Sequence, residues 1–394
     1  MSDVPHLRFP EFRGEWEETT LGKISEVTKG SGISKDQLSE QGSPCILYGE
    51  LYTKYKSEII GEVYSRTELD SSSLVKSKAN DVIIPCSGET AIDISTARCV
   101  PFNNILLGGD LNIIRLKNDD GGFFAYQLNG VRKTDIARVA QGVSVVHLYG
   151  ENLKQITVYH PTIEEQKKIT RLLSLIDERI ATQNKIIEKM ESLIKGLSQR
   201  LLSPKQGWTS YKLDELCQIK SGYSGIQVSF QTAYKVSRIE TISNHCINMS
   251  RIGFVKEIPQ EYKLSVGDIL FSNINSVQYI GNTAFIDKDY GLYHGMNLLR
   301  IVPDSRIVFP RFIHLLLCSE RLLRHFQSIC NKAVSQASIN QTSLGKTIMT
   351  IPSYKEQQHI CSIIESVERK LDIETSLLKM LQYQKQYLLR QMFI

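Results

Sequence analysis

The chain carries one pattern twice, about 190 residues apart. Residues 16–30 recur as 208–222 at an offset of 192, and residues 161–169 recur as 352–360 at an offset of 191. This repeat is several times longer than the roughly 20–50 residues of a solenoid unit, so it indicates a duplicated domain. Between these anchors the two copies diverge widely. Repeated flanking segments around divergent central segments favour a protein with two similar domains that recognise different targets.

Length and composition describe an ordinary globular protein of two to three domains. Of its 394 residues, 41% are hydrophobic and 23% are charged, and no apolar run approaches the 18 residues of a membrane span. The first residues lack the apolar stretch of a secretory signal, and the eight cysteines form no Cys-x-x-Cys pair. We therefore expect a cytoplasmic protein with reduced thiols and no membrane contact. A net charge of +5 permits nucleic acid as a partner without requiring it.

Each copy reads as a mixed α/β body followed by a long helix. The bodies cover about 17–160 and 209–351. Matched buried strands are predicted at 81–85 and 267–271, and again at 112–116 and 297–301. Helices are predicted from Phe123 to Leu128 with continuation toward Arg138, and from Pro310 to Cys330.

The long helices show the spacing of a coiled-coil seam. From Ile169 onward, positions separated alternately by four and three residues are apolar in nine of ten cases, and in eight of ten at an offset of 191. The predicted seam residues are Ile169, Leu173, Ile176, Ile180, Gln183, Ile187, Ile360, Ile364, Val367, Leu371, Glu374 and Leu378. Each helix of some 40 residues would be about 60 Å long.

Connectivity sets the direction of the two helices. Only residues 203–207 separate the first helix from the second body, so that body must lie at the far end of this helix. The second helix can meet the first seam only by running back, which predicts an antiparallel pair with a pseudo-two-fold axis. The polar seam residues Gln183 and Glu374 each lie at a helix midpoint, so they should face each other and fix the register.

A search for catalytic motifs finds only partial matches. Gly345-Lys346-Thr347 resembles the end of a P-loop, but Asn340 stands where that motif needs glycine, and we interpret the segment as the entry to a strand. The Asn-Pro-Pro-Tyr type of methyltransferase site is absent, and the histidines have no partners at ligand spacing. We expect no catalytic residue and no metal site.

Polar loops supply binding chemistry instead. In each copy, small polar side chains follow the buried strand, and a second polar segment precedes the last strand. Such side chains contact base edges and phosphate oxygens. The candidate DNA-binding residues are Ser87, Gly88, Glu89, Thr90, Arg138, Gln141, Ser144, Ser272, Asn273, Asn275, Lys332, Ser335 and Gln336. Further basic residues within reach are Lys54, Lys56, Arg66, Arg98, Arg238, Arg251 and Arg324.

Together these features resemble the specificity subunit of type I restriction–modification enzymes. The resemblance is carried by residues 6–12, 15–16, 21–22, 267–270, 336–340 and 351–352, and by the Glu-Gln pairs 165–166 and 356–357. It implies an α+β chain with target-recognition domains at 1–162 and 204–353, each followed by a conserved spacer helix, at 163–203 and 354–394.

The resemblance also implies a function. Such a subunit has no active site and binds no cofactor. Each target-recognition domain reads one half of a bipartite sequence in double-stranded DNA, and the helices set the gap. Two modification subunits use S-adenosylmethionine to methylate adenine and dock on this scaffold, and two restriction subunits use ATP and magnesium. The alternative is a two-headed protein-interaction scaffold, and salt-dependent binding to duplex DNA separates the two.

Overall fold

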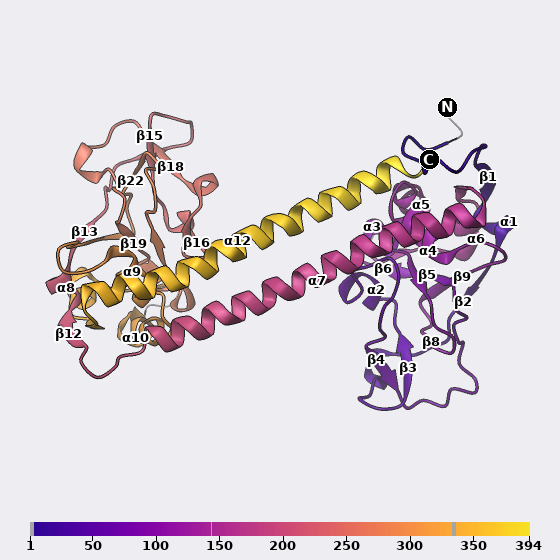
Figure 1. Ribbon diagram of the computed structural model, residues 1–394, viewed down its shortest axis with the longest axis horizontal. Coiled ribbons are helices and arrows are strands. Elements are labelled where there is room, and N and C mark those ends of the chain that lie inside the picture. Colours follow the sequence, from indigo (N-terminus) through magenta and orange to yellow (C-terminus); the bar gives the residue numbers. More distant parts are fainter. Residues whose placement is uncertain (1–3, 143, 333–335) are drawn as a thin grey trace. The chain divides into compact units, whose positions relative to one another are not determined.

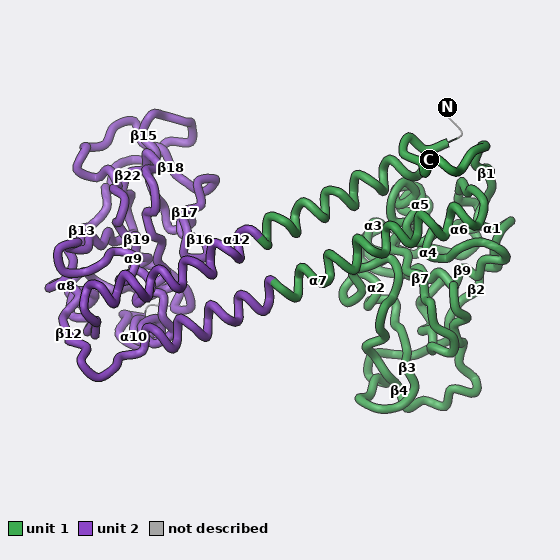
Figure 2. Tube along the Cα trace, in the orientation of Figure 1, with its two compact units in different colours: residues 1–186, 374–394 green, residues 187–373 purple. Residues whose placement is uncertain are grey.

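The structure is a computed structural model that describes residues 4–142, 144–332 and 336–394. It consists of two compact units (Figure 2): unit 1 contains residues 1–186 and 374–394, and unit 2 contains residues 187–373. Each of the two long helices, α7 (Ile163–Leu201) and α12 (Tyr354–Gln391), contributes one half to each unit (Figure 1). Among the described residues, no helix combines the length and apolar character needed to cross a membrane.

Unit 1 is built on a four-stranded antiparallel sheet whose faces are both buried. Its strand order is β2 (Ser25–Lys29), β9 (Leu111–Leu116), β5 (Asp81–Pro85), β7 (Arg98–Val100). Side chains alternate across a strand. Val82 and Ile84 therefore pack in the cluster that contains Phe123, while Ile83 packs in a different cluster with Ile46. One face thus meets the helices and the other meets the smaller sheet β4-β3-β8.

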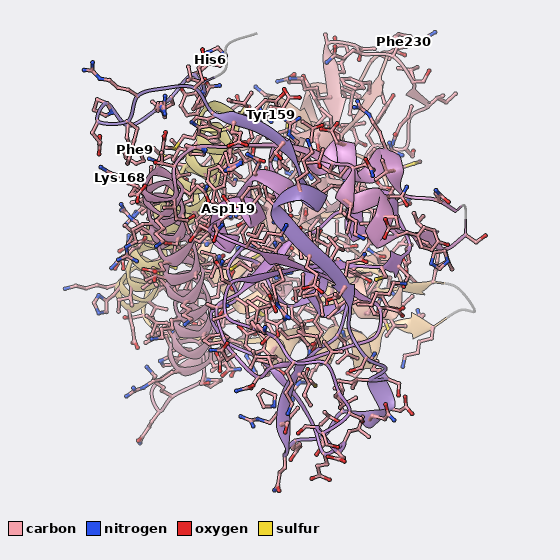
Figure 3. All side chains as sticks on the ribbon, turned by 90° about the vertical axis from the view of Figure 1, so that its right-hand side faces the viewer. His6, Phe9, Asp119, Tyr159, Lys168 and Phe230 are labelled. Carbon is pink, nitrogen blue, oxygen red and sulfur yellow. The ribbon has the colours of Figure 1, made fainter. Side chains whose placement is uncertain are left out.

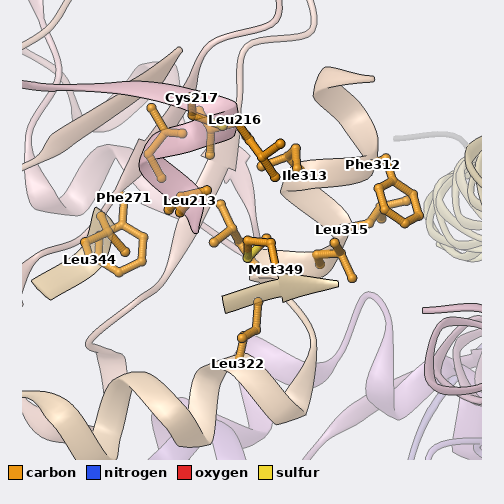
Figure 4. Packing of buried hydrophobic residues seen from close by; sticks show 14 of the residues in the cluster. Leu213, Leu216, Cys217, Phe271, Phe312, Ile313, Leu315, Leu322, Leu344 and Met349 are labelled. Atoms are coloured by element: carbon orange, nitrogen blue, oxygen red, sulfur yellow. The ribbon is translucent and has the colours of Figure 1, made fainter. Parts of the chain in front are cut away.

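Unit 2 repeats this plan with equivalent strands. The order is β13 (Cys217–Ser221), β23 (Leu299–Pro303), β19 (Ile269–Phe271), β21 (Thr283–Phe285), again antiparallel throughout. Phe271 and Phe312 belong to one helix-facing core cluster (Figure 4), in which the Phe271 ring contacts Phe326, and Leu270 packs in a different cluster. The strands predicted from sequence are therefore present in both units, and the duplication extends to strand order.

The remaining elements are short. In unit 1 they are β1 (Glu17–Thr20), α1 (Leu21–Ile24), η1 (Lys35–Gln37), β3 (Ser43–Ile46), α2 (Glu50–Thr53), β4 (Ser65–Thr67), β6 (Ser87–Gly88), α3 (Ala91–Ile94), β8 (Leu106–Leu107), α4 (Gly121–Asn129), α5 (Lys133–Val139), β10 (Val146–His147), α6 (Gly150–Lys154) and β11 (Thr157–His160). In unit 2 they are β12 (Thr209–Lys212), α8 (Leu213–Leu216), β14 (Gln227–Val228), β15 (Tyr234–Val236), η2 (Ile239–Thr241), β16 (Ile242–Ser243), β17 (Cys246–Ile247), η3 (Met249–Arg251), β18 (Gly253–Val255), η4 (Gln260–Tyr262), β20 (Ile274–Asn275), η5 (Val277–Tyr279), β22 (Leu292–Tyr293), α9 (Pro310–Leu317), α10 (Glu320–Ile329), β24 (Asn331–Lys332), β25 (Ala337–Ser338), α11 (Gln341–Gly345) and β26 (Ile348–Ile351).

The prediction of one helix from Pro310 to Cys330 is wrong, because the segment forms two helices. The Ser319 hydroxyl accepts a hydrogen bond from the Leu322 amide and starts α10 as an N-cap, which ends α9 at Leu317. In unit 1 the corresponding segment is likewise divided, into α4 and α5.

Within unit 1 the two long helices run antiparallel. Gln183 Nε2 donates to Glu374 Oε2 at 2.6 Å and to the Glu374 carbonyl at 3.0 Å, so the expected polar pair is present. Six residues before Gln183 in α7, Asp177 meets Lys385, which lies eleven residues after Glu374 in α12, so the two chains run in opposite directions. All the seam residues named above are buried or half-buried. The amide–carboxylate bond pairs these two polar groups within a mainly apolar seam.

A buried glutamine joins each body to its long helix. In unit 1, Gln166 Oε1 accepts from the Asp120 amide at 2.9 Å, and Gln166 Nε2 donates to the Pro161 carbonyl. In unit 2, Gln357 makes the same two bonds, to the Phe309 amide at 2.8 Å and to the carbonyl that precedes the helix. These glutamines belong to the repeated Glu-Gln pairs, and they fix the start of each helix against the sheet-covering helices.

The two ends of the chain complete unit 1. The Leu7 amide donates to the Gln391 carbonyl at 2.8 Å, and the Phe393 ring packs 5.2 Å from Phe123 and 6.4 Å from Trp16. Further along the N-terminal segment, Arg8 forms two 2.8 Å bonds with Glu165.

The same segment lies along α7. Lys168 Nζ lies 4.7 Å from the Phe9 ring, and both are labelled in Figure 3. This cation–π contact adds to the Arg8 bonds, so residues beyond the repeat proper are part of the fold of unit 1.

A buried charged cluster ties α12 to α7 and to the body. Lys385 Nζ lies 2.6 Å from Asp177 Oδ1 and 2.5 Å from Glu58 Oε2, and the Tyr126 hydroxyl donates to Asp177. Burial, and then the charge of Glu58, raise the pKa of Asp177 to about 6, while Lys385 lowers it. We refer to these four residues as the Lys385 cluster.

Candidate nucleic-acid interface

In unit 1 the two polar segments predicted from sequence lie against each other. Ser87 and Gly88 form β6, which pairs antiparallel with β10, so that Ser87 is opposite His147. The Leu148 amide also donates to the Cys86 carbonyl at 2.8 Å. Glycine is required at position 88, because a Cβ there would lie 2.5 Å from a methyl carbon of Ile94. The pairing of β6 with β10 therefore brings the two polar segments together.

The second segment is a closed loop. Gln141 and His147 exchange two backbone hydrogen bonds, of 2.9 and 2.7 Å. Gly142 has a φ of +123°, and a Cβ there would lie 2.1 Å from the Val145 carbonyl oxygen, so only glycine fits. Gln141 and Ser144 are exposed on a loop whose two ends are joined by backbone hydrogen bonds.

Other candidates of unit 1 have partners within the fold. The Thr90 hydroxyl accepts from the Asp93 amide at 3.1 Å and caps α3, so it shapes the loop. Glu89 is exposed beside it. Arg138 is 78% exposed and lies 3.0 Å from Asp135, a contact that it can exchange for a phosphate.

Arg98 is not available to a ligand, which corrects its inclusion among the basic residues within reach. It is buried, and its guanidinium donates to the backbone carbonyls of Leu51 and Tyr55. Burial lowers its pKa.

Unit 2 brings its two polar segments together in the same way. β20 pairs with β25, which also pairs with β24, so Asn275 is opposite Ala337 and Lys332 flanks the same strand. The Ile339 amide donates to the backbone carbonyl of Asn273 at 2.9 Å, and Asn273 Nδ2 donates to the Ile339 carbonyl at 3.4 Å. The interface of each unit is therefore a short sheet formed by the loop after the central strand and the segment before the last strand.

The individual candidates of unit 2 differ in exposure. Ser272 is buried, and its hydroxyl accepts from Asn275 Nδ2 at 3.2 Å, so it holds the loop and presents nothing to solvent. Lys332 and Gln336 are exposed. Ser335 lies outside the described residues.

Equivalent ion pairs lie at the start of the central strand in both units. Asp81 receives two bonds from Arg115 in unit 1, at 2.8 and 2.7 Å, and Asp268 lies 2.7 Å from Arg300 in unit 2. In each case the carboxylate also accepts an amide three residues earlier in the chain. Burial raises the pKa of Asp268, and the arginine opposes this. The aspartate that leads each central strand therefore fixes the start of the strand from which the loop emerges.

An exposed aromatic pair in unit 1 is absent from the sequence prediction. The rings of His147 and Tyr149 stack, with centroids 6.3 Å apart, next to the Gln141 loop. Tyr149 is 47% exposed. The two residues are separated by one position on an extended segment, which places their side chains on one side. The spacing of two residues on an extended segment could have indicated this pair from the sequence.

Unit 2 gathers His245, His314 and Cys318, which the sequence did not place together. Cys318 Sγ lies 3.3 Å from His245 and 3.5 Å from His314. Arg311 lies 2.8 Å from His314 Nδ1, so that nitrogen accepts and the proton sits on the nitrogen that faces the thiol. Burial lowers the pKa of both histidines and raises that of the thiol to about 12. The cluster is neutral and hydrogen-bonded, and no group of metal-binding side chains occurs among residues 4–142, 144–332 and 336–394.

The two units repeat one fold, and each carries a candidate interface made of two paired polar segments, so the protein belongs to the class of duplicated two-domain proteins. Comparison with known proteins gives the family. The type I restriction modification DNA specificity domain matches residues 13–192 and again 205–383, so the chain belongs to this family and contains two copies of its domain.

Curated relatives carry corresponding names. The chain is 32% identical over 194 residues to a putative type I restriction enzyme MjaX specificity subunit from Methanocaldococcus jannaschii, an alignment covering 48% of this chain and 46% of the relative. It is 22% identical to the MjaVIII specificity subunit of the same organism, covering 93% of this chain and 89% of the relative. The chain thus spans about half the length of the first relative and most of the second.

Solved structures share the fold. The S subunit of a type I restriction–modification system from M. genitalium has a TM-score of 0.64 at 17% identity, covering 99% of each chain. A chain from a structure on complex assembly and conformational transition of the type I R-M system has a TM-score of 0.59 at 15% identity, covering 95% of this chain and 96% of that one.

Proposed function

We propose that this chain is the sequence-specific DNA-binding specificity subunit of a type I restriction–modification complex, in which each unit reads one half of a bipartite target. The observation that carries the proposal is the duplicated interface. Both units have the same central sheet with two paired polar segments next to it, but the amino acids of these segments differ between the units. Family membership supports it. The chain contributes no catalytic group in this proposal and needs no cofactor of its own.

The same proposal assigns the partners. Double-stranded DNA is the ligand, two methyltransferase subunits that use S-adenosylmethionine dock on the helices, and two restriction subunits that use ATP and magnesium complete the complex in the cytoplasm. We assign residues 1–162 and 204–353 to target recognition, and 163–203 and 354–394 to the spacer helices. Exposed candidates such as Gln141, Ser144 and Gln336 are proposed to contact DNA, and buried Ser272 to hold its loop.

Exchanging one body tests the two-reader arrangement. Residues 17–160 are replaced by the body of a relative with a different target, and bound sequences are selected from random DNA duplexes. We expect only one half-site to change, because each interface is built within a single unit. A change in both half-sites would contradict separate readers. Wild-type binding that does not weaken with salt would exclude phosphate contacts and favour the protein-interaction scaffold.

A groove along the helices of unit 1 supports docking of the methyltransferase subunit. Its volume is about 580 Å³, and it is lined by Leu172, Leu175, Ile176, Glu178, Arg179, Thr182, Gln183, Leu377, Leu381 and Gln384. Leu175 and Leu377 are 40% and 37% exposed, and Met380 and Tyr383 on the same helix are 66% and 70% exposed. An apolar groove with a charged rim fits an amphipathic helix of a partner.

Placing charge in this groove is expected to weaken assembly. In Leu175→Glu/Leu377→Glu, two carboxylates would be desolvated by the partner, so we expect binding of the methyltransferase subunit to fall at least tenfold. Co-purification or calorimetry with that subunit measures the effect, while DNA binding by the chain alone should be unchanged. Ile226→Glu, at a side chain that is 89% exposed in unit 2, is the control. Equal loss in both variants would place docking elsewhere.

A further inference from the structure

A shallow hollow in unit 2 lies between the two segments of the interface. Its volume is about 550 Å³, and it is lined by Ser276, Val277, Gln278 and Gln327. η5 follows directly on the Ser272–Asn275 loop, and α10 directly precedes β24 with Lys332. The two elements are seated on each other, because a Cβ on Gly281 would lie 2.7 Å from Phe326. The hollow is therefore a formed surface beside the predicted loops.

Two glutamine side chains are free at this hollow. Gln278 is exposed and Gln327 is half-buried. Within the part of the chain that the structure describes, neither side-chain amide makes a hydrogen bond. An amide carries both donors and an acceptor, so each can make the paired contact that reads a base edge.

The duplicated frame shows that these two positions vary on a fixed background. Buried Ile280 in unit 2 corresponds to buried Ile94 in unit 1, so Gln278 corresponds to Ile92, two residues before the anchor. Buried Phe326 corresponds to Ile136 in the same way, so Gln327 corresponds to Ala137.

The anchors keep their apolar character while the surface positions change from amide to aliphatic. Ile92 is 50% exposed, so much of this apolar side chain is accessible to a ligand. A fixed core beneath a changed surface is what two readers of different sequences require.

We propose that Gln278 and Gln327 are specificity-determining residues of unit 2, which read an adenine through its major-groove edge. A glutamine amide accepts from N6 of adenine and donates to N7, and the other three bases lack this pattern. The same place in unit 1 has Ile92, which can contact the methyl group of thymine instead. The two half-sites therefore differ at this position. This inference rests on the proposed DNA-reading function.

The test uses the full chain and a pool of random DNA duplexes at one salt concentration. The bound duplexes are sequenced for the wild type, Gln278→Ala/Gln327→Ala and Gln278→Glu/Gln327→Glu. The matched control is Gln358→Ala, which removes an exposed amide from α12 in the same unit. We expect the alanine variant to lose about tenfold preference for adenine at one position of one half-site. In the glutamate variant the preference should shift toward cytosine, whose N4 amino group donates to a carboxylate.

Each other outcome is decisive. If both variants select the wild-type motif, the inference is wrong while the proposed function stands. Loss of all binding in the variants but not in the control also contradicts it, because phosphate contacts made elsewhere should retain binding to random duplexes. If the wild type selects no motif at all, the proposed function fails and the inference with it.

Discussion

Replacing Lys385 with alanine is expected to lower the free energy of unfolding of unit 1 by about 3–5 kcal/mol. The substitution leaves Asp177 and Glu58 buried, with side chains 8% and 9% exposed, and without their shared cation. Urea denaturation followed by Trp16 fluorescence measures the change. The chain has two tryptophans, so a Trp208→Phe background makes this signal specific to unit 1.

The loss should depend on pH in a defined direction. The pKa of Asp177 is raised to about 6 from an ordinary value near 3.8, so the folded state keeps a proton that the unfolded state has lost between these values. This carboxyl therefore destabilises the fold as pH rises from about 4 to 6, and Lys385 offsets that effect. We expect Lys385→Ala to cost less at pH 5 than at pH 8.

Two comparisons distinguish the effect of the unpaired buried charges from the effects of helix propensity and of a smaller side chain. Lys379→Ala removes an exposed lysine from the same helix and should change stability by no more than about 0.5 kcal/mol. Adding Glu58→Gln and Asp177→Asn to Lys385→Ala should recover part of the loss, because neutral amides have a smaller desolvation cost. A cost for Lys379→Ala as large as that for Lys385→Ala would show that the cluster is not responsible.

Replacing Phe393 with alanine is expected to destabilise unit 1 by about 3–5 kcal/mol, although the residue is next to last in the chain. Its side chain is 4% exposed and packs between Phe123 and Trp16. The substitution leaves a cavity in the core that covers the sheet. The same tryptophan signal reports the change, and a shift in its emission maximum should accompany it because the ring contact is lost.

Phe230→Ala is the matched control. Phe230 is 58% exposed, so its removal should leave the stability of both units within about 0.5 kcal/mol of the wild type. If Phe393→Ala proves equally neutral, the C-terminal residues do not contribute to the core as described.

The sequence predicted the features that recur at a fixed spacing. Seam periodicity located both long helices and the Gln183–Glu374 pair, since an antiparallel pair must bring its midpoints together. Buried apolar runs that follow a turn, matched between the two copies of the repeat, located the central strands. The one-helix prediction at 310–330 failed because Ser319, which is followed by Glu320 and Arg321, acts as the N-cap of a second helix.

Contacts between residues far apart in the chain escaped prediction. Lys385 and Glu58 are 327 positions apart, and no periodicity links them. The sequence likewise does not indicate which arginines are buried. Arg98 is buried and donates to backbone carbonyls, whereas Arg138 is exposed to solvent. The hollow beside Gln278 is lined by two segments that are 49 positions apart, at Gln278 and Gln327, so no local pattern indicates it.

The contribution of residues 374–394 to unit 1 sets an order for folding during synthesis. Domains ordinarily fold in sequence from the N-terminus as they leave the ribosome. Here unit 2 is a continuous segment that is fully synthesised at residue 373, whereas the core of unit 1 lacks Phe393 until twenty further residues have been added. The core of the first body therefore stays incomplete on its helix-facing side during synthesis. More than two hundred further residues are made before residues 374–394 can pack against it. The body translated first is the one finished last.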